Sequence, residues 1–165
     1  TPELQRLIAE PAPLVVAKST LRALVHRRTT SDYVGIKRYN EGGEPVGETR
    51  FVGLFTSEAF TEPTRNIPML RRKANWVLEQ SGHAPGGHNY KTLRKIIEYY
   101  PREELWQIER QDLLAIARGI LHLLDRPRAR VFTRRDRFNR FVTALTYIPK
   151  DRFNSELRER VGQAR

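Results

Sequence analysis

RVFTRRDRFNRFVTALTYIPKDRFNSELRERV, residues 130–161, places two strand-like runs before a helix-like run. The runs 130–135 and 141–148 are rich in β-branched and aromatic residues, and the loop between them has Asp136 and Asn139 at turn positions. This pattern predicts an antiparallel hairpin. Pro149 has no N–H to donate and ends the second strand, and Asn154 is the predicted N-cap of the following helix.

The segment just upstream extends this pattern. Residues 104–108 are a short apolar run, which we interpret as a strand. A helix follows from Asp112 and ends before Pro127. Its apolar positions recur at helical spacing and predict one buried face, made of Leu113, Ile116, Ala117, Ile120, Leu121 and Leu124. Residues 104–162 therefore predict a ferredoxin-like βαββα unit that lacks its last strand.

In the N-terminal half, the spacing of the apolar residues differs from that of the helix at 112–126. Residues 2–10 predict a short helix, and the strong turn signal at 40–45 lies among strand-like runs. Those runs predict an antiparallel meander of four strands, at 14–18, 21–27, 33–39 and 46–56. Two helices, one beginning near Pro68 and one near Asn89, then connect the meander to the hairpin.

The predicted fold class is α+β. We expect three domains: an antiparallel β meander at 1–62, a helical connector at 63–103 and the βαββα module at 104–165.

Composition limits the class of partner. The chain has 165 residues and a formal net charge of +11, which favours nucleic acid, an anionic ligand or an anionic partner domain. The alternative is that a fragment separated from its acidic partner surface shows unbalanced charge. Cysteine is absent, which excludes disulfides and thiolate metal sites, and no apolar run reaches the length of a membrane span. No signal peptide is recognisable, so we expect a cytoplasmic protein without a membrane partner.

No motif for catalysis is present. The sequence lacks a dinucleotide-binding glycine pattern after a strand and lacks a P-loop. The four histidines do not have the spacing of metal ligands, although His83 and His88 share one glycine-rich loop. We therefore predict no catalytic, cofactor-binding or metal-binding residues in this chain.

The basic hairpin is the feature with the most chemical interest. Residues 126–140 contain seven arginines and one acid, interleaved with Phe132 and Phe138. Arginine binds phosphate or carboxylate through two parallel hydrogen bonds, and aromatic rings can stack on bases, so a nucleic-acid-binding module is one hypothesis. The alternative is that the arginines pair with acids elsewhere and the phenylalanines are core. The basic, glycine-rich run typical of RNA-binding sheets is absent, which makes nucleic acid the less favoured partner.

Five ordered blocks of sequence resemble the N-terminal regulatory region of the large bacterial NAD-specific glutamate dehydrogenases. They are DYVGIKRY (32–39), GETRFVGLFT (47–56), IPMLRRK (67–73), YYPREELWQI (99–108) and RVFTRRDRFNRFVTALTYIPKDRFNSELR (130–158). The resemblance covers roughly residues 14–158. It implies an ACT-like module at 104–165 and places the meander at the end of a PAS-like sheet. ACT modules that bind amino acids usually carry a glycine after the first strand, and residues 108–112 have none.

The resemblance also implies a function. The chain would be a non-catalytic regulatory and oligomerisation fragment of an NAD-dependent glutamate dehydrogenase, with NAD bound elsewhere in the parent enzyme. Its partners would be other domains and subunits of that enzyme, together with a small-molecule effector. Arg134, Arg135, Asp136 and Arg140 are the predicted inter-domain or effector-facing surface.

Overall fold

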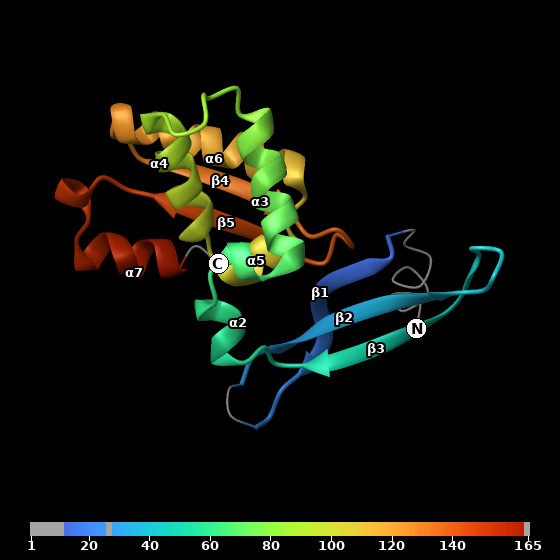
Figure 1. Cartoon of the computed structure of the whole chain (residues 1–165). Coiled ribbons are helices and arrows are strands. Elements are labelled where there is room, and N and C mark those ends of the chain that lie inside the picture. The colour runs from blue at the N-terminus through green and yellow to red at the C-terminus, as the bar shows by residue number, and fades with distance from the viewer. Residues whose placement is uncertain (1–11, 26–27, 164–165) are drawn as a thin grey trace. The chain divides into compact units, whose positions relative to one another are not determined.

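The computed structural model describes residues 12–25 and 28–163 (Figure 1). The predicted helix at 2–10 lies outside the described residues. The chain divides into two compact units. Unit 1 comprises the chain up to Arg71 together with Tyr100–Gln107, and unit 2 comprises Arg72–Tyr99 together with the chain from Ile108. In chain order the strands and helices are β1 (Leu14–Arg22), β2 (Thr30–Tyr39), β3 (Pro45–Gly53), α2 (Ser57–Thr61), the 3-10 helix η1 (Thr64–Asn66), α3 (Pro68–Gln80), α4 (His88–Glu98), α5 (Arg102–Gln107), α6 (Arg110–Asp125), β4 (Arg130–Arg135), β5 (Val142–Tyr147), the 3-10 helix η2 (Lys150–Arg152) and α7 (Ser155–Gln163).

Unit 1 contains an antiparallel sheet in the order β1-β2-β3. The β2–β3 hairpin closes through a tight turn in which Gly43 has a φ of 80°, a conformation that glycine adopts without strain. The predicted meander is therefore confirmed, but with three strands instead of four. The separate strands predicted at 14–18 and 21–27 imply a reversal of the chain at Ser19, and this prediction was wrong because β1 continues to Arg22. The Ser19 hydroxyl accepts a hydrogen bond from the Leu21 N–H at 2.8 Å, and the chain shifts register between Lys18 and Arg22 without reversing direction.

Helix α5 replaces the strand predicted at 104–108, and that interpretation was wrong. Glu103 and Glu104 occupy the first helical turn, where negative charge is favourable, and Leu105 is fully buried. The Trp106 ring stacks on Phe55, with ring centroids 5.3 Å apart. A five-residue apolar run fits a strand or one helical turn equally well, so periodicity alone could not separate the two.

Unit 2 is built on α6. Helix α4 packs against it, and the inward face of α6 matches the prediction over three turns. The last turn differs, because Leu123 is buried whereas Leu124 is 60% exposed. The predicted burial of Leu124 was therefore wrong.

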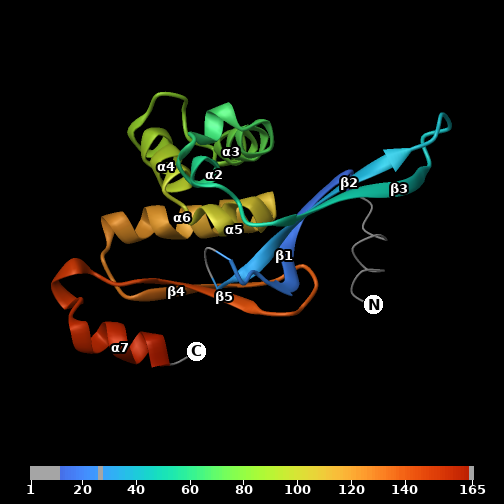
Figure 2. The same ribbon diagram turned by 90° about the horizontal axis from the view of Figure 1, so that it is seen from below.

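The β4–β5 ribbon packs on α6 through a close contact. A Cβ atom added at Gly119 would lie 2.5 Å from the Phe132 ring, so only glycine lets the helix approach the strand this closely. The predicted hairpin is confirmed, with Phe132 paired to Leu145 and Arg134 paired to Thr143. Figure 2 shows α6 on one side of the ribbon and α7 on the other.

The α+β class and the order of meander, helices and hairpin are confirmed. Within the described ranges, no helix is both long enough and apolar enough to cross a membrane.

Candidate functional site

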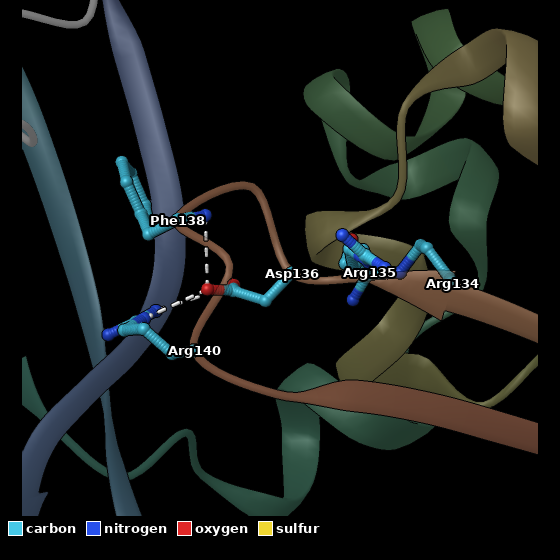
Figure 3. Close-up of polar contacts among 5 residues, drawn as sticks. All are labelled: Arg134, Arg135, Asp136, Phe138 and Arg140. Atoms are coloured by element: carbon cyan, nitrogen blue, oxygen red, sulfur yellow. Dashed lines mark hydrogen bonds and ion pairs between the residues drawn. The ribbon is translucent and has the colours of Figure 1, made fainter.

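The four predicted surface residues lie at and beside the turn between β4 and β5 (Figure 3). Arg134 and Asp136 are buried, Arg135 is exposed, and Arg140 is largely covered. The sequence therefore located a single cluster, but its members do not present a common surface. Whether the cluster faces an effector or another domain stays a prediction.

Asp136 holds the turn together. One carboxylate oxygen accepts hydrogen bonds from the Phe138 N–H at 3.1 Å and from Arg140 Nε at 2.8 Å. The other oxygen accepts a longer bond of 3.4 Å from Arg140 Nη2. Asn139 adopts a φ of 57°, which asparagine tolerates better than most residues. Because its charge is balanced and its oxygens are occupied, Asp136 acts within the turn.

Two arginines of the hairpin make further contacts in unit 2. Arg134 Nη1 donates to the carbonyl oxygen of its neighbour Arg135 at 3.1 Å, within the same strand. Arg137 forms an ion pair with Glu109, the N-cap residue of α6. The turn of the hairpin is thus connected to the start of the helix on which the ribbon packs.

Lys73 is a half-buried cation that the sequence pattern did not reveal. Its ammonium donates a hydrogen bond of 2.7 Å to the Ile108 carbonyl oxygen. Burial lowers the pKa of Lys73 from 10.5 to about 8, which Glu109 partly opposes, and Arg137 and Arg134 lower the pKa further. The sequence contained one indication of this burial: Lys73 directly precedes Ala74, which belongs to the apolar stripe of α3.

The aromatic residues of the hairpin point inward. Phe132 and Phe138 are buried, and the guanidinium groups of Arg130 and Arg140 lie 4.9 Å and 5.2 Å from the centroids of these two rings. These rings are therefore part of the packing and are not available to stack on bases. The interpretation of Phe132 and Phe138 as core residues is confirmed. Nucleic-acid binding by the arginines of residues 126–137, several of which are exposed, stays a prediction.

Unit 1 holds a second charged cluster that the sequence analysis missed. The Glu48 side chain is only 1% exposed and accepts hydrogen bonds from the Tyr33 hydroxyl at 2.7 Å and from Arg50 Nε at 3.1 Å. Lys37 Nζ lies 3.5 Å from the same carboxylate. Gly35 provides the space, because a Cβ there would lie 2.3 Å from the carboxylate oxygen.

This environment changes two pKa values. Burial alone would raise the pKa of Glu48, but the hydrogen bonds from Tyr33 and Arg50 and the charge of Lys37 outweigh it, so the pKa lies below 4.5. Burial, followed by the hydrogen bond to Glu48, raises the pKa of Tyr33 to about 12. The hydrophobic periodicity of the sequence could not reveal the cluster, because the cluster depends on the cross-strand register that pairs Lys37 with Glu48.

Across the parts of the chain that the structure covers, no group of three or more His, Cys, Asp or Glu residues is arranged to hold a metal ion. Among the described residues, His83 and His88 are therefore not joined by a third potential ligand of these types.

Comparison with known proteins places these features in a family. Residues 67–126 match helical motif 1 of glutamate dehydrogenase, and residues 130–164 match the ACT2 domain of glutamate dehydrogenase. The chain is 44% identical over 153 residues to the NAD-specific glutamate dehydrogenase of Halomonas elongata, 35% identical over 156 residues to that of Pseudomonas aeruginosa and 31% identical over 153 residues to that of Mycobacterium tuberculosis. These matches cover 93%, 94% and 93% of the chain but only 10%, 10% and 9% of the respective relatives. The chain therefore belongs to the NAD-specific glutamate dehydrogenase family, in which it corresponds to a segment with helical motif 1 and ACT2-domain sequence.

Proposed function

We propose that this chain is a regulatory and oligomerisation segment of an NAD-dependent glutamate dehydrogenase, an enzyme that converts glutamate to 2-oxoglutarate and ammonia. The segment itself would be non-catalytic, and NAD would bind in another part of the enzyme. Its partners would be other domains and subunits of that enzyme in the cytoplasm, with a small-molecule effector as a further partner.

One observation carries this proposal: the two matched segments are joined within unit 2. Gly119 in helical motif 1 receives the Phe132 ring from the ACT2 segment, and Glu109 forms an ion pair with Arg137. We call these two contacts the α6–hairpin seam. A change in position of the hairpin must therefore move α6 or break the seam.

The proposed mechanism is a difference in contacts between two states of the enzyme. An effector or a neighbouring domain that contacts the exposed Arg135 in one state only would stabilise that state, and the seam would transmit the bias to α6. Asp136 and Arg140 would keep the turn rigid, so that a displacement of the hairpin moves the whole ribbon and does not only deform the turn.

The first experiment tests the non-catalytic role. The purified 165-residue chain is mixed with glutamate and NAD, and NADH formation is followed by absorbance. We expect no glutamate-dependent signal, and turnover by the chain alone would refute the proposal.

The second experiment tests regulation in a full-length enzyme that carries this segment. Arg137→Ala removes the ion pair of the seam, and Arg128→Ala removes one exposed arginine outside it. Both variants lose the same charge. We expect Arg137→Ala to change the kinetic constants for glutamate severalfold while Arg128→Ala leaves them unchanged. If the two variants had the same kinetic constants for glutamate, the proposed role of the seam would be contradicted.

A further inference from the structure

Lys73 of α3 reaches the start of α6 inside unit 2. Its ammonium donates a hydrogen bond of 2.7 Å to the carbonyl oxygen of Ile108, which lies two residues before α6 begins. The side chain is half-buried, so protein covers most of it while part of it keeps contact with solvent. A small solute can therefore approach this lysine, and its immediate surroundings are those of the protein interior.

The β4–β5 hairpin brings two guanidinium groups toward the same place. Phe132 contacts α6 near the middle of the helix, and Arg137 forms an ion pair with Glu109 at its start, so β4 runs toward the beginning of α6. Arg134 lies two residues beyond Phe132 and therefore projects from the same face of the strand, where it is buried. The charges of Arg137 and Arg134 both act on the Lys73 amine.

This cluster disfavours the protonated form of Lys73. Burial and the two guanidinium groups oppose its positive charge, and the Glu109 carboxylate compensates only in part, so the pKa is about 8. At pH 7.5, about a quarter of such amines carry no proton, against about one in a thousand for a lysine with the ordinary pKa of 10.5. A neutral amine is a nucleophile, so Lys73 can react with an electrophile near neutral pH.

The neighbours of Lys73 favour one kind of electrophile. Three cations and one carboxylate form the cluster, and a reaction that turns the amine into an anion leaves two cations and two anions. Guanidinium groups bind a carboxylate through paired hydrogen bonds, so they suit the new anion. Carbon dioxide produces such a group, and it is small enough to reach a half-buried side chain. The product keeps one N–H, which can still donate to the Ile108 carbonyl oxygen.

We propose that Lys73 is a site of reversible carboxylation by dissolved carbon dioxide, and that Arg137 and Arg134 hold the resulting carbamate. The nitrogen lone pair forms a bond to the carbon of carbon dioxide, one carbon–oxygen π bond breaks, and its electrons become the negative charge of the new carboxylate. The proton that the nitrogen loses goes to solvent water, so the step needs no oxidant, reductant or further reactant. This inference does not rest on the proposed regulatory role, because it concerns the covalent state of one side chain.

Glu109 competes with the carbamate for Arg137. Its carboxylate pairs with Arg137, and its negative charge raises the pKa of Lys73. Glu109→Gln should therefore favour the carbamate, whereas Arg137→Gln should disfavour it by removing a cation that holds the product. The Glu109 side chain is 53% exposed and makes no capping hydrogen bond to α6, and the Arg137 side chain is 33% exposed, so both variants should fold.

The test traps the carbamate in a full-length enzyme that carries this segment. The enzyme is equilibrated with isotope-labelled bicarbonate and carbon dioxide near neutral pH and treated with a trialkyloxonium salt, which converts a carbamate to a stable ester. Proteolysis and mass spectrometry then give the occupancy of each lysine. We expect the labelled ester on Lys73 at an occupancy at least about tenfold above that on Lys91 and Lys95, two exposed lysines of α4, because far more of the Lys73 amine is neutral.

Three variants test whether the cluster holds the carbamate. Glu109→Gln should raise the occupancy of Lys73 severalfold, and Arg137→Gln should lower it severalfold. Arg128→Gln removes an exposed arginine outside the cluster and should leave the occupancy unchanged. Circular dichroism checks that each variant folds. The proposal would be overturned if Lys73 carried no more label than Lys91, or if the substitutions at Glu109 and Arg137 both left its occupancy unchanged.

Discussion

Replacing Gly119 by alanine tests the closest contact in unit 2. The new Cβ would lie 2.5 Å from one Phe132 ring carbon and 2.9 Å from another. An ordinary contact needs at least about 3.4 Å, so the ring must move by nearly 1 Å, and overpacking of this kind costs roughly 1–3 kcal/mol. Alanine is favoured over glycine inside a helix by about 1 kcal/mol. The net expectation is a loss of about 0–2 kcal/mol in the free energy of unfolding of unit 2.

Gly162 provides the matched control. It also lies in a helix, α7, but apart from its chain neighbours and the backbone of that helix none of the described atoms lies within 4 Å of the position that its Cβ would occupy. Gly162→Ala should therefore be neutral or stabilising, by up to about 1 kcal/mol. The two substitutions make the same chemical change, and their effects should differ by about 1–3 kcal/mol because of Phe132 alone.

Urea denaturation followed by fluorescence measures the effect. The two tryptophans, Trp76 and Trp106, lie in different units, so a Trp106→Phe background leaves Trp76 as the reporter of unit 2. In that background, Phe132→Leu should make room for alanine, and Gly119→Ala should then become favourable. The reasoning is refuted if Gly119→Ala stabilises unit 2 as much as Gly162→Ala does, or if Phe132→Leu leaves its effect unchanged.

Three further predictions concern the charged groups. Glu48 has a folded-state pKa below its ordinary value, so its contribution to stability is present above about pH 4.3 and is lost as the pH falls through the folded-state pKa. In thermal melts at acidic pH, the melting temperature of Glu48→Gln should depend less on pH than that of the unmodified chain. Tyr33 has a raised pKa, so its contribution is complete below about pH 10 and is lost as the pH rises toward about 12; Tyr33→Phe should remove that alkaline loss in the same assay. Lys73 has a folded-state pKa of about 8, against an ordinary value of 10.5. The unfolded chain therefore binds more protons between these two pH values, and the free energy of unfolding rises with pH there, by up to about 3 kcal/mol. Urea titrations across this range should show that Lys73→Met abolishes the rise.

Local patterns in the sequence were sufficient for most of the fold. The β4–β5 hairpin and the α6 face could be predicted because each depends on residues close together in the chain. The errors occurred where a short run fits two structures. Residues 104–107 are helical, and Trp106 stacks on Phe55, a contact between residues far apart in sequence that a local pattern does not show. Leu123 is buried and Leu124 is exposed, the reverse of the predicted pattern. Both residues lie in the last turn of α6, where the helical periodicity no longer determines which side chain faces the core.

The candidate site was predictable in location and not in arrangement. The arginines and Asp136 lie in one loop, so their proximity follows from the sequence. Burial of Asp136 and its bond to Arg140 depend on the shape of the turn, which the residue types do not determine. The cluster around Glu48 depends on the register of β2 with β3, and Lys73 depends on the packing of α3 near the start of α6. Such long-range relations are not visible in local periodicity.

The α6–hairpin seam is the central feature of the proposed function, and its most direct test is kinetic. Glutamate oxidation is measured in a full-length enzyme carrying this segment, with Gly119→Ala, Phe132→Leu and both substitutions together. We expect Gly119→Ala to change the kinetic constants for glutamate, and we expect the addition of Phe132→Leu to restore them toward the original values. If Gly119→Ala destabilises unit 2 but leaves glutamate kinetics unchanged, the seam does not transmit regulation and the account is contradicted.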